Sequence, residues 1–269
     1  MNITEIVKLR RSVRTFAEEK TLDENIINEI KDFLNTVSNP YGIKIEWFIL
    51  DKKENKLSSP VIVGEKYYIA GKMKKIEHAE EAFGYEFEDI VLFLTSKNIG
   101  TTWIAGTMNR DKFHEAVALK EDEVMPCVSP IGYPAAKMSI RESLMRKGVG
   151  ADKRLDFDDL FFLENFDTPL TSELKEKYKD IFELVRLAPS AVNRQPWRLV
   201  IKDDYIHLYE SRNKGFIKDS WDIQKIDMGI ALNHLTNGLK ERGVKYSYSS
   251  IDPKIDSNEL IYIISIKLE

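Results

Sequence analysis

Residues 188–197 read APSAVNRQPW, and they follow a stripe of apolar residues at helical spacing. Proline cannot continue a helix, so Pro189 forces the chain out into a loop. That loop offers the hydrogen-bonding side chains of Ser190, Asn193 and Gln195, and Trp197 opens the next strand. A structural loop with Trp197 as its buried side chain is one interpretation. Several polar side chains interleaved with two prolines favour a binding loop instead.

A second polar stretch lies near the start of the chain, where residues 10–16 read RRSVRTF. Arg10, Arg11 and Arg14 are permanent cations, and guanidinium groups bind phosphate through paired hydrogen bonds. The segment is predicted to be an extended exit from a short helix over residues 2–9. Such a cluster, taken alone, is more often the solvated end of a helix. The second interpretation is a phosphate-binding segment that includes the hydroxyl of Ser12.

Three shorter stretches complete the pattern. Residues 99–106 read IGTTWIAG, and their small side chains permit close approach of the backbone to a planar ring. Residues 130–134 read PIGYP, and residues 153–155 read KRL. The chain has no GxGxxG or Walker motif, so a Rossmann or P-loop interpretation has no support.

Together these stretches resemble the FMN-binding elements of the nitroreductase family. In that family the arginine run and the Ser/Asn/Gln loop both occur early in each subunit of a homodimer, whereas here they lie in different halves of one chain. The resemblance implies an α+β nitroreductase-like fold in which two related halves form an intrachain pseudo-dimer. We expect the halves to be residues 1–165 and 166–269, with residues 163–169 as the linker.

The resemblance also implies individual roles. Arg10 and Arg154 would contact the FMN phosphate, with Arg11 and Ser12 on the ribityl and phosphate side. Arg14 would lie near the N1–C2=O edge of the flavin ring and stabilise the anionic reduced form. The backbone amides around Ala105 and Gly106 would face flavin N5, and Trp103 and Ile104 would bind the cofactor from the same stretch. From the other half, Pro189, Ser190 and Ala191 would approach the flavin, while Asn193 and Gln195 would organise their loop.

The departures from the family pattern indicate one site per chain. Residues 37–42 read VSNPYG where the first half would carry its Ser/Asn/Gln loop. Residues 167–170 read DTPL where the second half would carry its arginine run. Only one complementary set of segments is therefore present, and a monomer is possible because the pseudo-dimer lies within one chain.

Apolar periodicity predicts the main elements. A capping box at Thr21 and Glu24 opens a helix that ends at residues 39–42, and a strand follows over residues 43–49. A largely apolar helix is expected from Tyr85 to Lys97. The second half repeats this order with a helix over residues 174–185, a strand after Trp197 and a core helix over residues 228–239.

Composition limits the remaining possibilities. The chain has 269 residues, a formal net charge of −4 and one cysteine, Cys127. These values argue against a nucleic-acid surface, a disulfide and a multi-cysteine zinc site. No signal peptide and no run of ~20 apolar residues is evident, so we expect a cytoplasmic protein without a membrane span.

Other polar residues are assigned to structure or to solvated surfaces. The four histidines have no metal-ligand spacing, and His234 is expected on the polar side of its helix. Residues 72–75, which read KMKK, are expected to form a solvated face. Four acids are interpreted as surface residues of helices: Glu80, Glu81, Asp158 and Asp159. No acid–base residue is assigned.

The function that the resemblance implies is an FMN-dependent oxidoreductase. The flavin would take hydride from NADH or NADPH and reduce a nitroaromatic, a quinone or a similar small acceptor. One alternative is a flavin-binding or regulatory module without turnover. Another is a degenerate member that binds no flavin.

Overall fold

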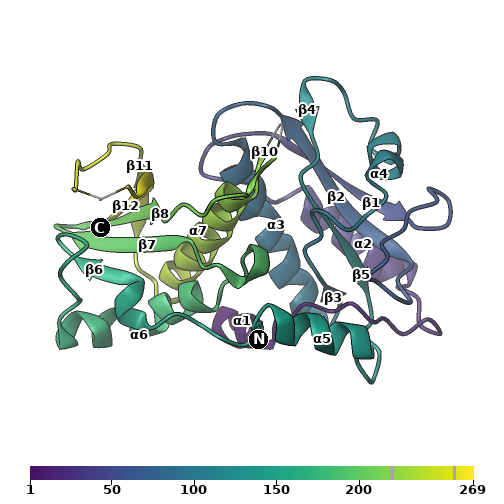
Figure 1. The fold of residues 1–269 in the computed structure, drawn as a ribbon, viewed down its shortest axis with the longest axis horizontal. Coiled ribbons are helices and arrows are strands. Elements are labelled where there is room, and N and C mark those ends of the chain that lie inside the picture. The colour runs from purple at the N-terminus through teal and green to yellow at the C-terminus, as the bar shows by residue number, and fades with distance from the viewer. Residues whose placement is uncertain (219–220, 257–258) are drawn as a thin grey trace. The chain divides into compact units, whose positions relative to one another are not determined.

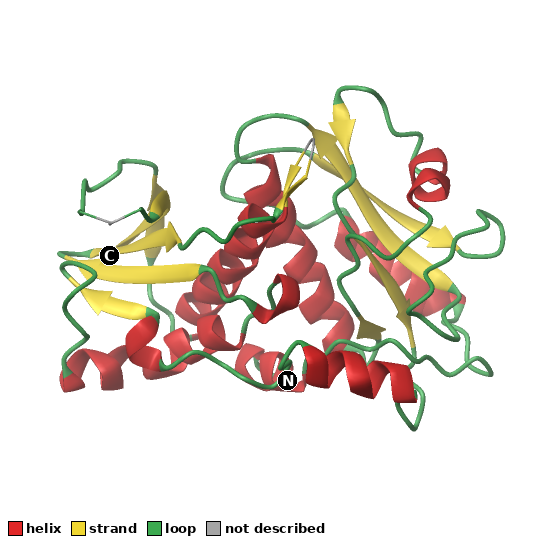
Figure 2. Ribbon diagram, in the orientation of Figure 1, coloured by secondary structure: helices red, strands yellow, loops and turns green. Residues whose placement is uncertain are grey.

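The computed structural model describes residues 1–218, 221–256 and 259–269. The chain divides into two compact units, each with its own sheet and helices (Figures 1 and 2). Residues 9–151 form the first, here called the arginine unit. Residues 1–8 and 152–269 form the second, here called the loop unit. The expected α+β class is confirmed.

The arginine unit contains an antiparallel sheet of five strands in the order β1-β2-β5-β3, with β4 paired to β2. The strands are β1 (Ile45–Asp51), β2 (Tyr67–Lys74), β3 (Gly100–Thr101), β4 (Glu123–Val124) and β5 (Val128–Gly132). Its helices are α2 (Glu24–Leu34), α3 (Ala79–Ser96), α4 (Arg110–Ala116) and α5 (Ile140–Gly148). The predicted strand over residues 43–49 is therefore present as β1.

Helix α3 packs against the sheet of the arginine unit through aromatic side chains. The indole of Trp47 on β1 contacts Phe83 and Phe87 of α3, with ring centroids 5.1 Å away in each case. Gly71 on β2 makes room for this indole, because a Cβ there would lie 2.4 Å from it. The helix begins at Ala79 rather than at Tyr85, since its first turns are also buried.

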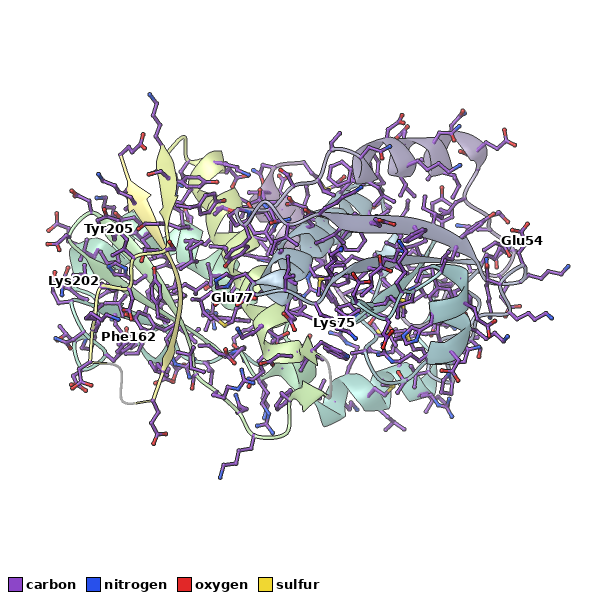
Figure 3. All side chains as sticks on the ribbon, turned by 90° about the horizontal axis from the view of Figure 1, so that it is seen from above. Glu54, Lys75, Glu77, Phe162, Lys202 and Tyr205 are labelled. Atoms are coloured by element: carbon purple, nitrogen blue, oxygen red, sulfur yellow. The ribbon has the colours of Figure 1, made fainter. Side chains whose placement is uncertain are left out.

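The loop unit contains a sheet in the order β11-β12-β8-β7-β6, in which only the β6–β7 pair is parallel. These strands are β6 (Phe161–Leu163), β7 (Trp197–Lys202), β8 (Tyr205–Glu210), β11 (Tyr246–Ser249) and β12 (Ile261–Leu268). Lys202 and Tyr205, labelled in Figure 3, pair next to the β7–β8 turn. A short ribbon joins β9 (Ile217–Lys218) to β10 (Trp221–Asp222).

Three helices belong to the loop unit: α1 (Ile3–Leu9), whose last residue lies beyond the unit boundary, α6 (Ser172–Leu187) and α7 (Ile223–Glu241). Short 3₁₀ turns, η1 and η2, lie at Phe157–Asp159 and Ala191–Asn193. Helices α6 and α7 pack closely at Gly238, where a Cβ would lie 3.1 Å from the side chain of Ile181. At the end of α7, Glu241 accepts hydrogen bonds from the Ile3 amide and the Thr4 hydroxyl, both at 2.6 Å.

Two local predictions are wrong. Helix α2 is capped by Asp23, whose carboxylate accepts the Ile26 amide at 2.9 Å, while the Thr21 hydroxyl accepts from Lys66. The helix also ends at Leu34, ahead of residues 39–42. Asp is as good an N-cap as Thr, so the sequence alone did not decide between neighbouring caps.

The first residue of the expected linker, Leu163, is the last residue of a strand. Phe161–Leu163 pairs with β7, and the Leu163 amide donates to the Thr168 carbonyl at 2.9 Å. The boundary between the two compact units lies between Ala151 and Asp152, earlier in the chain than residue 165. The first eight residues belong to the loop unit.

Three polar residues assigned to solvated surfaces are buried. Lys72 lies 3.1 Å from Glu123, and Glu81 lies 3.4 Å from the imidazole of His78. The Nδ1 atom of His234 is 2.8 Å from the Leu184 carbonyl oxygen. Helices α3 and α7 are buried over most of their circumference, and Glu81 and His234 lie on their buried faces. Lys72 lies among the buried residues of β2.

Candidate functional site

The arginine segment, residues 10–16, makes an isolated bridge to β3. Ser12 bridges Thr101, and the Val13 amide donates to the Thr101 carbonyl at 2.8 Å. Gly100 permits this approach, because a Cβ there would lie 2.9 Å from Val13. The glycine of the IGTT stretch thus brings two of the predicted site segments together.

The first turn of α5 holds the segment through Glu142, which is 1% exposed. One carboxylate oxygen of Glu142 accepts the Thr15 hydroxyl at 2.8 Å and the Arg14 amide at 3.2 Å. The other lies 3.3 Å from the Arg11 guanidinium. Ser139 caps α5 by accepting the Glu142 amide at 3.1 Å. Four contacts therefore fix both the helix start and the arginine segment.

Arg10 is a buried cation whose side chain is 9% exposed. Its Nε atom lies 3.9 Å from the Glu88 carboxylate, and that nitrogen is buried without a hydrogen bond. Burial lowers the pKa of Arg10, Glu88 raises it and Arg146 lowers it again. Buried charges are normally paired and hydrogen-bonded, so the guanidinium fits an additional anionic ligand.

Glu88 also contacts the second predicted segment. Its other oxygen accepts the indole N–H of Trp103 at 3.2 Å, and the Trp103 ring lies 4.5 Å from that of Phe87. Arg14 is half-buried; burial lowers its pKa, Glu142 raises it and Arg146 lowers it. The arginine segment and Trp103 are therefore linked through one buried carboxylate on α3.

The backbone of residues 103–106 is held in place from two sides. Ile104 exchanges two hydrogen bonds with Val128, at 2.9 and 3.0 Å. Arg110 donates to the carbonyls of Ala105 and Met125, the latter at 2.7 Å. A Cβ placed on Gly106 would meet no atom within 4 Å, so the space beside this glycine is open.

In the loop unit, residues 188–197 form a second group of predicted site residues. The Ser190 hydroxyl accepts the Gln195 amide at 2.9 Å, and Trp197 is fully buried. Val192, Asn193 and Gln195 have φ of 44°, 58° and 51°, which is the left-handed region. Such strain persists only where surrounding contacts hold it, and it often marks a functional loop.

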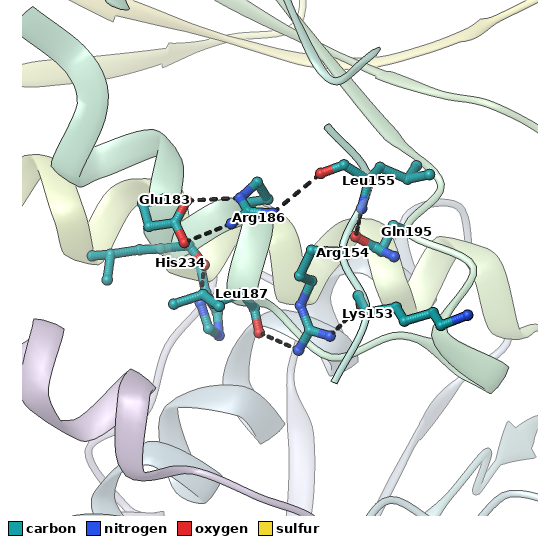
Figure 4. Close-up of polar contacts among 9 residues, drawn as sticks. Lys153, Arg154, Leu155, Glu183, Arg186, Leu187, Gln195 and His234 are labelled. Atoms are coloured by element: carbon teal, nitrogen blue, oxygen red, sulfur yellow. Dashed lines mark hydrogen bonds and ion pairs between the residues drawn. The ribbon is translucent and has the colours of Figure 1, made fainter. Parts of the chain in front are cut away.

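The segment with Arg154 lies along this loop (Figure 4). The Leu155 backbone amide donates to the Gln195 side-chain oxygen at 3.0 Å. The Asn193 side-chain amide donates to the Lys153 carbonyl at 2.9 Å. Arg154 donates to the Asn193 side chain and to the Leu187 carbonyl, both at 3.4 Å. The side chains of Asn193 and Gln195 thus join this loop to residues 153–155.

The structure therefore gathers the predicted residues into two groups. The arginine unit holds Arg10, Arg11, Ser12, Arg14, Trp103, Ile104, Ala105 and Gly106. The loop unit holds Arg154, Pro189, Ser190, Ala191, Asn193 and Gln195. In each group the named segments are joined by hydrogen bonds or packing.

Sequence reasoning missed four residues that fix these groups: Glu88, Arg110, Glu142 and Asp227, whose carboxylate accepts the Ala191 amide at 3.0 Å. All are charged residues within or beside helices, where a sequence pattern cannot distinguish them from surface residues. Arg110 had one signal, since it follows the IGTTWIAG stretch by four residues.

Neither a metal-binding cluster of side chains nor a membrane-spanning helix is present among the described residues. No three His, Cys, Asp or Glu side chains among them are grouped so that they could hold a metal ion. Within residues 1–218, 221–256 and 259–269, no helix has the length and apolar character to cross a membrane.

Comparisons with known proteins support one family. A crystal structure named as that of "a putative nitroreductase" from Thermotoga maritima is 26% identical, with a TM-score of 0.65, and covers 100% of this chain and 93% of that one. An FMN-dependent nitroreductase from Clostridium difficile is 17% identical, with a TM-score of 0.42, and covers 53% of this chain and 94% of that one. A comparison with curated proteins gave no match. Residues 2–238 match the family model described as "Putative TM nitroreductase", and the chain belongs to this nitroreductase family.

Proposed function

We propose that the protein is an FMN-dependent oxidoreductase that takes electrons from NADH or NADPH and reduces a nitroaromatic, a quinone or a similar small acceptor. Family membership supports the oxidoreductase class. The motifs at residues 10–16, 99–106 and 188–197 support FMN as the cofactor. A cytoplasmic location belongs to the same proposal, as do related halves at residues 1–165 and 166–269, which would allow a monomer to carry the site.

The observation that carries the proposal is the buried Arg10 guanidinium. It makes no hydrogen bond to a described residue, and its nearest carboxylate oxygen is 3.9 Å away. Because a guanidinium fork matches phosphate, the FMN phosphate would complete its hydrogen bonding. Arg11 and Ser12, on the same held segment, would bind the phosphate and ribityl side. Arg154 is the phosphate contact proposed from the loop unit.

The flavin ring would be held by other residues of the same two groups. Arg14 would lie at the N1–C2=O edge, where its charge favours the anionic reduced flavin. The amides of residues 103–106 would face N5 across the open side of Gly106. Residues 189–191 would contact the ring from the loop unit. When bound, FMN supplies hydride acceptance and delivery at N5, while these residues bind and orient it.

The direct test begins with purified full-length protein. We expect a yellow protein whose released ligand co-elutes with FMN, and oxidation of NADH or NADPH that depends on an added nitroaromatic or quinone. Bound FMN without acceptor-dependent oxidation would contradict the enzyme proposal and indicate a binding module. Absence of binding after titration with FMN would contradict the cofactor assignment itself.

A further inference from the structure

Asp227 on α7 is 3% exposed and contacts the loop that carries Pro189, Ser190 and Ala191. Both of its carboxylate oxygens accept the Ala191 amide, at 3.0 and 3.1 Å. Ala191 opens the 3₁₀ turn that follows Pro189. One buried carboxyl group therefore fixes the backbone at the tip of the proposed flavin-contacting segment.

The surroundings of Asp227 make this carboxyl group costly for folding. Glu210 on β8 and Asp222 at the start of α7 are also buried acids, and Arg212 forms ion pairs with both, at 2.8 Å to Glu210. Burial raises the pKa of Asp227 well above its usual value; the Ala191 amide lowers it, and Glu210 and Asp222 raise it further. An acid in this setting does not add stability by its charge.

The loop that Asp227 holds is strained. Val192 is β-branched and has a φ of 44°, and Asn193 and Gln195 also have positive φ values. A loop in this conformation relaxes unless contacts over-determine it. The Ala191–Asp227 pair is the contact that immediately precedes the strained residues, and Ser190 and Gln195 close the loop behind it.

We propose that Asp227 is a positioning residue that sets the backbone of residues 189–191 for flavin binding, at a cost to the stability of the fold. This inference rests on the proposed function. Asp227 acts through the Ala191 amide and does not itself touch the flavin. The conservative variant Asp227→Asn keeps an oxygen that can accept this amide, whereas Asp227→Ala leaves the amide unpaired.

The experiment compares these two variants with wild type in the full-length protein, by FMN titration and by thermal unfolding of the apo-protein. Asp227→Ala is expected to weaken FMN affinity by about tenfold, because the Ala191 amide loses the hydrogen bond that fixes residues 189–191. Its apo melting temperature is expected to stay equal or to rise. Asp227→Asn is expected to keep the affinity within about threefold of wild type.

Trypsin gives a readout that does not involve FMN, because Arg194 is exposed within the strained loop. Cleavage after Arg194 in the apo-protein is expected to accelerate in Asp227→Ala and to stay near wild type in Asp227→Asn. Glu241→Ala, at the other end of α7, is the control; it removes the contacts to Ile3 and Thr4 and is expected to lower the melting temperature without changing FMN affinity.

Several results would overturn the inference. They are unchanged FMN affinity in Asp227→Ala, equal loss of affinity in both Asp227 variants, or a fall in melting temperature that accounts for the lost affinity. Unchanged cleavage after Arg194 would also overturn it. A wild-type protein that binds no FMN would instead contradict the proposed function, and the cleavage rates would still test whether Asp227 holds the loop.

Discussion

Arg10 has the clearest ligand-binding character of any single residue in the arginine segment. Arg10→Ala should weaken FMN binding by about 1.5–3 kcal/mol, because it removes charge-assisted hydrogen bonds to phosphate. The free energy of unfolding of the apo-protein should change less, since Glu88 keeps its hydrogen bond from Trp103. FMN titration and chemical denaturation of the same samples measure the two effects.

Arg10→Lys is the matched control for this prediction. Lysine keeps the charge but loses the planar fork, so its FMN affinity should lie between those of wild type and Arg10→Ala. If Arg10→Ala lost stability while its FMN affinity stayed at the wild-type value, Arg10 would have a structural role instead.

His207 makes a separate prediction about pH. Burial lowers its pKa to about 4, Lys202 lowers it too, and Asp203 and Asp252 raise it. An unfolded histidine titrates near 6.5, so below that pH the unfolded chain binds a proton that the folded chain excludes. The free energy of unfolding therefore has its full value above pH 6.5. Protonation of His207 in the unfolded chain lowers it by about 2–3 kcal/mol as the pH falls toward 4.

The measurement compares wild type with His207→Gln by denaturant unfolding between pH 7 and pH 4. Glutamine can still hydrogen-bond the Ser265 hydroxyl, which lies 2.6 Å from His207 Nδ1. The difference in unfolding free energy between the two proteins should shrink as the pH falls. A difference that does not vary with pH would show that His207 does not titrate in this range.

At the scale of elements, the first turn of α5 supports the arginine segment. Glu142→Ala should lower the free energy of unfolding by about 2–4 kcal/mol, because three donors lose a buried charged acceptor. It should also weaken FMN binding, since the segment loses its fixed position. Calorimetry and FMN titration give the two values.

Ser143→Ala tests the same turn without touching the arginine segment. Ser143 is exposed, so this variant should unfold and bind FMN as wild type does. A Glu142→Ala protein as stable as Ser143→Ala would contradict the role assigned to Glu142.

For the whole molecule, we predict one FMN per chain. Residues 37–42 stand where the first half would carry its binding loop, and the polar groups of Asn39 are used within the first half. Its side-chain amide donates to the Ile43 carbonyl at 2.7 Å and to Glu86 at 2.6 Å. Its oxygen accepts the amides of Tyr41 and Ile43. Released flavin, quantified against protein, should approach a ratio of one. A ratio near two would mean that residues 37–42 also bind flavin.

Much of the fold followed from the sequence by itself. Apolar periodicity and the breaking residues predicted α1, α6, β1 and β7, because helix and strand periods are local properties of the chain. The combination of residues 10–16, 99–106 and 188–197 indicated the family that the comparison confirms. Short motifs can indicate a family because the residues that form them are neighbours along the chain.

Only the tertiary structure decided which charged residues support these motifs. Glu88, Glu142 and Asp227 look like helix-surface acids in the sequence, yet each is buried against a backbone or side-chain donor from a distant segment. The parallel pairing of β6 with β7 likewise placed Leu163, the first residue of the expected linker, in a strand. Burial depends on what packs against a residue, and a sequence pattern records only the residue's own neighbours along the chain.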